Sequence, residues 1–110
     1  MATSPNDLLQ GTLGLLALRA LRDESRHGWG IQQRINQIAD NVLSVNQGSL
    51  YPALIRLEKQ GLIKSDWGTS EAGRRAKYYA LTTKGRKQMD AETANWKKFS
   101  SVVDLILETA

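Results

Sequence analysis

Apolar residues recur at helical spacing along most of this 110-residue chain and predict four helices. The predicted helices are 4–22, about 26–39, a third that starts between Asn46 and Ser49 and stops at Gly61, and a fourth from Thr82 or Thr83 to about Leu107. Ser4 can cap the first helix, with Pro5 in its first turn. The short connection between the second and third helices gives this pair the spacing of a helix-turn-helix.

A strand pattern separates the third and fourth helices. Alternating apolar residues predict two strands, Ile63–Trp67 and Lys77–Leu81. The polar loop between them, 68–76, contains two glycines and is long for a hairpin. The sequence therefore predicts a mainly α protein with a small β-hairpin: a winged helix-turn-helix in residues 1–81, followed by a C-terminal dimerisation helix in residues 82–110.

The predicted third helix is apolar on one face and polar or basic elsewhere. Leu50, Leu54 and Leu57 stand at i, i+4 and i+7 and form the apolar face. Pro52 has no N–H to donate and must lie in or near the first turn, while Gly61 supplies a left-handed stop. The remaining hydroxyl, Arg and Lys side chains suit contacts with DNA phosphates and base edges.

The first and fourth helices carry more apolar surface than one small core can cover. The first has two apolar stripes on different faces, formed by Leu9, Leu13, Leu16 and Ala20 and by Leu8, Leu15 and Leu18. The fourth has a coiled-coil-like seam of Met89, Trp96, Phe99, Val103 and Ile106. Homodimerisation through these two helices is the economical explanation.

Four motifs in a fixed order resemble those of the PadR family of bacterial transcriptional regulators. They are Leu9–Leu13, His27–Ile31, Asn46–Ile63 and Arg74–Gly85, and the third is similar to the family's recognition helix. The resemblance covers Leu8 to about Gly85, with Trp29 where the family more often has tyrosine. We therefore expect a homodimeric repressor whose third helices and basic hairpins, or wings, bind double-stranded DNA at a pseudo-palindromic operator.

The candidate DNA-binding residues lie at the start of the second helix, on the third helix and in the wing. They are Trp29, Gln47, Ser49, Tyr51, Arg56, Lys59, Arg74, Arg75 and Lys77. Alternatives remain open for several of them: Trp29 could anchor the turn instead of donating to a phosphate, and Tyr51 could pack beneath its helix. Arg56 could pair with neighbours of Glu58 or face solvent, and basic loops are usually only solvated.

Trp96 carries a second hypothesis that comes from the resemblance. The short family branch with a single C-terminal helix includes multidrug-sensing regulators, in which a tryptophan at this place meets its symmetry mate and sandwiches planar aromatic ligands. By resemblance, the residues lining such a pocket are Leu8, Thr12, Leu15, Trp96, Phe99, Val103 and Asp104. The alternative is that Trp96 is an ordinary core residue of the dimer seam.

Composition excludes several kinds of chemistry. With no Cys and one His, the chain offers no disulfide, thiolate metal site or cysteine nucleophile, and we interpret His27 as structural. No paired carboxylates, catalytic triad or phosphate loop appears, so neither an enzyme nor a cofactor is expected. The longest leucine-rich run, Leu8–Leu21, is too short to cross a bilayer and follows no basic segment, which favours a cytoplasmic protein.

The charge distribution says more than the net charge of +4 or the pI of about 9.6. Nine basic residues against three acidic ones fall between Ser49 and Lys87, around the proposed DNA-binding elements. The rival hypothesis is a winged-helix module that uses this basic face to bind an acidic protein partner.

Overall fold

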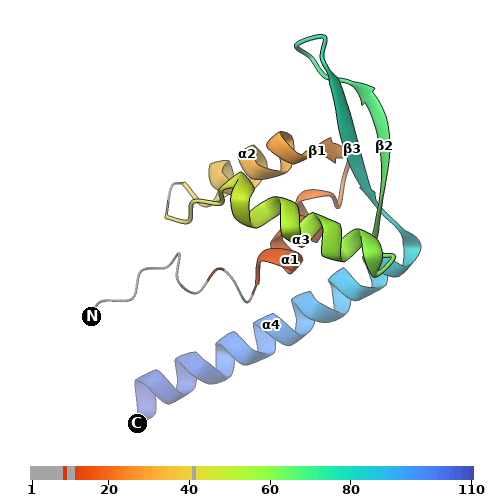
Figure 1. Cartoon of the computed structure of the whole chain (residues 1–110). Coiled ribbons are helices and arrows are strands. Elements are labelled where there is room, and N and C mark those ends of the chain that lie inside the picture. The colour runs from red at the N-terminus through yellow and green to blue at the C-terminus, as the bar shows by residue number, and fades with distance from the viewer. Residues whose placement is uncertain (1–8, 10–11, 41) are drawn as a thin grey trace.

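The computed structural model describes residues 9, 12–40 and 42–110, which form a bundle of helices with a small sheet on one side and a long final helix below (Figure 1). The elements in chain order are α1 (Leu13–Ala20), β1 (Arg26–His27), α2 (Gly28–Ile38), α3 (Gln47–Lys59), β2 (Ile63–Thr69), β3 (Arg75–Leu81) and α4 (Thr83–Thr109). The sheet is antiparallel with strand order β1-β3-β2. The predicted fold class is confirmed.

The hydrophobic core lies where α1, α2 and α3 meet the base of the hairpin and the first turns of α4. Its largest fully buried side chains are Leu18, Ile31, Val45, Leu50, Leu54, Ile63 and Met89. The position of Met89 corrects the sequence analysis, which placed it in a dimer seam. The start of α4 packs on α1, so this methionine completes the chain's own core instead.

The turn between α2 and α3 is fixed by two side-chain amides of α2. Asn36 binds both backbone groups of Val45, accepting from its N–H at 2.8 Å and donating to its carbonyl at 3.1 Å. Gln32 donates to the same carbonyl at 2.9 Å. Because these bonds satisfy the backbone of a buried residue in the turn, they hold α3 at a fixed angle to α2.

Helix α3 begins and ends as its sequence indicates. The Asn46 side chain caps it by accepting from the Ser49 N–H at 2.9 Å, and Gly61 has the left-handed φ of +75° that ends it. Pro52 is the sixth helical residue, just past the first turn. The prediction of a helix start between Asn46 and Ser49 is confirmed.

The boundary predicted for the second helix was wrong at its start. Arg26 and His27 form the short strand β1, which pairs with Tyr79 and Tyr78 of β3. His27 then caps α2, because its Nδ1 accepts from the Gly30 N–H at 2.9 Å. A two-residue strand is too short to leave an alternating pattern in the sequence.

The hairpin strands are each two residues longer than predicted. Pairing continues through Gly68↔Ala76 to Thr69↔Arg75, and the loop shrinks to residues 70–74, with Gly73 at φ +77°. Apolar alternation stops earlier because this end of the hairpin stands clear of the core. The helix predicted over 4–22 was wrong in its described part, because α1 begins at Leu13, after Thr12 as its N-cap residue, and ends at Ala20. The predicted start at Ser4–Pro5 lies outside the described residues.

Helix α4 is tied to the end of α3 at its first turn. Thr82 caps α4, and its hydroxyl also lies 2.6 Å from the Gly61 carbonyl oxygen. The Lys84 ammonium donates to the Gln60 carbonyl at 2.7 Å. The two carbonyls that directly follow α3 are therefore bound by the N-cap and first turn of α4. No helix in the described part of the chain is long and apolar enough to span a membrane.

Candidate nucleic-acid interface

Helix α3 presents three different surfaces outside the core. Its outward row is Gly48, Pro52, Ile55 and Lys59, which follow at steps of four, three and four and are all exposed. Tyr51 and Glu58 lie on the side of the wing, the hairpin of β2 and β3. Arg56 lies on the opposite side, where it lines a hollow with α1 and α4. Arg56 also lines a depression with Gly48 and Pro52, so it borders the outward row on its α1 side.

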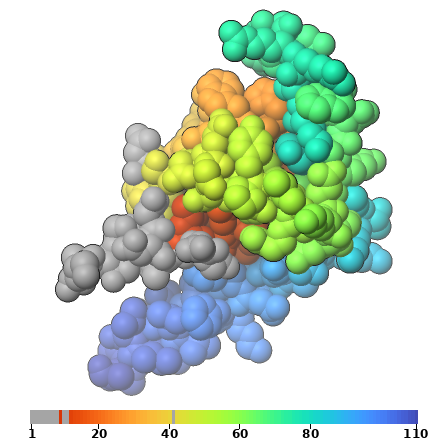
Figure 2. Space-filling model, in the orientation of Figure 1, coloured from red at the N-terminus to blue at the C-terminus, as the bar shows by residue number. Residues whose placement is uncertain are grey.

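A groove of about 690 Å³ separates the wing from α2 and α3. Figure 2 shows the wing rising clear of the body beside these helices. Six of the residues that line the groove are Trp29, Tyr51, Trp67, Arg74, Arg75 and Lys77. Five of these are candidates from the sequence, and the fold brings them together from three elements and the wing loop.

Tyr51 takes part in packing and in the groove at once. A Cβ atom added at Gly28 would lie 2.8 Å from the Tyr51 hydroxyl oxygen, so the ring rests on bare backbone at the start of α2. The side chain is nevertheless 40% exposed. The ring thus packs on the start of α2, where Gly28 makes room for it, and contact of its exposed part with DNA stays a prediction.

The start of α2 combines a helix N-terminus with an exposed indole. Trp29 is the second residue of α2 and is 54% exposed. The His27 ring lies between aromatic neighbours, with its centroid 6.2 Å from that of Trp29 and 5.3 Å from that of Tyr78. The positive end of the helix dipole at this point favours a phosphate group.

In the wing, Arg75 stacks on Trp67; the sequence analysis identified Arg75 as a candidate but not Trp67. The Arg75 guanidinium carbon lies 4.4 Å from the centre of the Trp67 ring, which is itself 56% exposed. Trp67 was assigned only to the strand pattern. A large aromatic residue at the solvent end of a hairpin, opposite basic residues, was the signal available for it.

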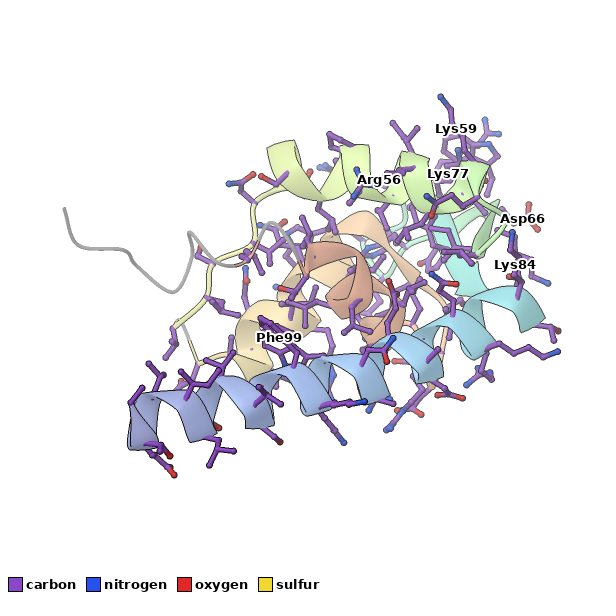
Figure 3. All side chains as sticks on the ribbon, turned by 90° about the horizontal axis from the view of Figure 1, so that it is seen from below. Arg56, Lys59, Asp66, Lys77, Lys84 and Phe99 are labelled. Carbon is purple, nitrogen blue, oxygen red and sulfur yellow. The ribbon has the colours of Figure 1, made fainter. Side chains whose placement is uncertain are left out.

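Lys77 is held against α3 rather than free in the groove. Its ammonium lies 3.8 Å from a Glu58 carboxylate oxygen, and Glu58 also accepts from the Ser65 hydroxyl. Figure 3 shows Lys59 and Lys77 at the end of α3 that adjoins the wing. Burial, and next the charge of Glu58, raise the pKa of the hydroxyl of Tyr79, whose ring centre lies 6.0 Å from the Lys77 ammonium.

The remaining DNA-binding candidates lie around the start of α3 and the wing loop. Gln47 is the first helical residue and half-buried, and Ser49 is exposed two positions later. Arg74 is exposed, and its backbone closes the loop through bonds with Ser70. Ser49 and Arg56 line a depression on the α1 side of α3, away from the groove.

The candidate ligand residues are brought together in part. Thr12, Leu15, Trp96 and Phe99 line one hollow of about 530 Å³ between α1, α3 and α4. The Trp96 and Phe99 ring centroids are 6.1 Å apart, and Figure 3 shows Phe99 on the side of α4 that faces the body. Val103 and Asp104 lie further along α4 and outside this hollow, and Leu8 lies outside the described residues.

The helix-turn-helix, its basic wing and the groove between them define a winged-helix DNA-binding protein. Residues 17–91 match the model of the transcriptional regulator PadR-like family. The chain belongs to this family, whose members are DNA-binding regulators and not enzymes.

Solved structures of similar proteins agree with this assignment. A transcriptional regulator from Clostridium thermocellum is 30% identical with a TM-score of 0.80, over 89% of this chain and 95% of that one. A PadR-like regulator from Bacillus cereus is 29% identical with a TM-score of 0.80, over 94% and 98%. A PadR family regulator from Eggerthella lenta is 32% identical with a TM-score of 0.78, over 94% and 88%.

Proposed function

We propose that this protein is a homodimeric repressor that binds a pseudo-palindromic operator. The observation that carries the proposal is the groove in which Trp29, Tyr51, Arg74 and Arg75 converge beside the exposed row of α3. In this arrangement α3 enters the major groove while the wing and the start of α2 contact the flanking phosphates. Lys59 and the wing arginines supply the sequence-independent attraction.

The second half of the proposal is that two copies pair through α4 and α1. The last four turns of α4 expose Trp96, Phe99, Val102, Leu105 and Ile106, each between 47% and 61%. So long an apolar face on one helix is costly in water, and a second copy of the chain would cover it. Such a dimer places two recognition helices about 34 Å apart on successive major grooves.

We further propose that planar aromatic molecules bind near Trp96 and alter DNA affinity. The support is the hollow that Trp96 shares with Thr12, Leu15, Phe99 and Arg56, because Arg56 belongs to the recognition helix. A molecule seated there would contact α3 and α4 at once. Titration of a planar cationic dye should quench tryptophan fluorescence in the parent protein, and an equal quench in Trp96→Ala would contradict this site.

The decisive experiment titrates the purified protein into a labelled duplex from its own upstream promoter and a scrambled duplex of equal length. Both titrations are run at two salt concentrations. We expect promoter-selective binding that weakens with salt, with a logarithmic slope near 0.9 per phosphate neutralised. No binding to either duplex at low salt would overturn the proposal and favour an acidic protein partner for the basic face.

A further inference from the structure

The exposed row of α3 has an apolar residue at its centre. Ile55 is 53% exposed, one turn beyond Tyr51 and one turn before Lys59. It is the ninth residue of a 13-residue helix, within the part that can lie in a major groove. The branched side chain therefore points out from the surface proposed to meet base pairs.

The neighbours of Ile55 on this row offer few side-chain hydrogen bonds. Gly48 and Pro52 have no polar side-chain atoms, and only Lys59 at the far end carries a charge. The longer polar residues lie on the two flanks of the row: Arg56 lines the hollow beside α4 and the depression next to Gly48 and Pro52. On the other flank Glu58 binds Ser65 and Lys77 of the wing. The middle of the row is thus suited to an apolar contact.

Base pairs present one prominent apolar group in the major groove, the C5-methyl group of thymine. We infer that Ile55 contacts a thymine methyl group in the operator half-site and so selects thymine at that position. This inference rests on the proposed insertion of α3 into the major groove. Uracil, which lacks only this methyl group, is the matched substitute for thymine.

The test uses a duplex that the full-length protein selects from a random-sequence library. The selected duplex is prepared with thymine and, separately, with deoxyuridine at every thymine position. The parent protein is expected to bind the thymine duplex about fourfold more tightly for each methyl group it covers. Ile55→Ala should bind the two duplexes with nearly equal affinity, whereas Ile55→Val should retain most of the preference.

Two further variants separate this contact from general effects. Ile38→Ala removes an apolar side chain of similar exposure from α2 and should keep the parent's ratio of affinities for the two duplexes. Lys59→Ala should weaken binding to both duplexes equally, because it removes attraction to phosphate. Circular dichroism melts of every variant establish that the proteins compared are folded.

Several outcomes would overturn the inference. Equal affinity of the parent protein for the two duplexes would contradict a methyl contact, as would selected sites with no fixed thymine. An equal loss in the parent and in Ile55→Ala would assign the methyl contact to another residue. Failure to select or bind any duplex would instead contradict the proposed function, so the two failures are distinguishable.

Discussion

At the scale of single residues, the wing depends on how an arginine is held. A free Arg side chain loses rotamer entropy when it binds a phosphate, and stacking on Trp67 restricts Arg75 before any DNA arrives. The same stack also shields one face of an exposed indole. Trp67 is uncharged and is thus expected to raise DNA affinity by holding Arg75 in place.

Substitutions of these two residues should therefore change DNA affinity and its salt dependence differently. Arg75→Ala should weaken DNA binding and lower the salt slope by about 0.9, because one phosphate contact is lost. Trp67→Ala should weaken binding about two- to fivefold while the salt slope stays unchanged, because the arginine is still present. Fluorescence anisotropy at four salt concentrations measures both quantities. An equal fall in slope for Trp67→Ala would contradict this division, and Trp67→Phe is the conservative control.

Tyr79 should make the free energy of unfolding depend on pH in the alkaline range. Burial and then the carboxylate of Glu58 raise the pKa of its hydroxyl above the ordinary value of 10.0. The folded protein then holds a proton that the unfolded chain releases first, so this stabilisation is complete below pH 10 and is lost as the pH rises through the raised pKa. The free energy of unfolding, measured with urea from pH 8 to 11, should fall less steeply with pH for Tyr79→Phe than for the parent. Parallel curves would contradict this role.

At the scale of elements, the start of α4 packs tightly against the end of α3. A Cβ atom at Gly85, the third residue of α4, would lie 1.8 Å from the Leu62 carbonyl oxygen. The same turn carries the bonds from Thr82 and Lys84 to the end of α3. We therefore expect a shift at the start of α4 to move the end of the recognition helix with it.

Gly85→Ala tests how tight this joint is. The added methyl group meets backbone, so the chain must shift, and we expect the free energy of unfolding to fall by at least about 2 kcal/mol. Gly14→Ala is the matched control, because a Cβ atom there has only an ordinary contact at 3.7 Å and alanine favours a helix. Chemical denaturation compares the two. A Gly85→Ala variant as stable as Gly14→Ala would show that the joint is loose.

Elements with local signals were predictable from the sequence, and those made by distant pairing were not. The caps at Asn46 and Thr82 and the stop at Gly61 lie within a few residues of the helices they bound. Strand β1 exists only because Arg26 and His27 meet β3, some fifty residues away in the chain. The burial of Met89 in the monomer core likewise depends on the angle at which α4 packs on α1, and the spacing of apolar residues does not specify that angle.

The candidate interface shows the same division. The basic residue types of the wing identified Arg74, Arg75 and Lys77 of the groove, since charge and sequence position are local information. Helical spacing could not say which flank of α3 faces the wing, so Arg56 was grouped with residues on the far side. Ile55 and Trp67 were passed over because an apolar residue in a regular pattern is normally interpreted as core.

At the scale of the whole molecule, the exposed half of α4 governs whether the proposed operator binding occurs at all. Leu105 is 61% exposed, so a charge there should leave the monomer fold intact. At a dimer seam the same charge would be buried twice without a partner and would prevent association. Leu105→Glu should therefore sediment as a monomer and lose affinity for a palindromic duplex by at least about a hundredfold, while still binding a single half-site weakly. Ile38→Glu, on a similarly exposed apolar residue of α2, should remain dimeric. A Leu105→Glu protein that sediments and binds like the parent would place the dimer contact elsewhere, because α4 would then be free in the DNA-bound state.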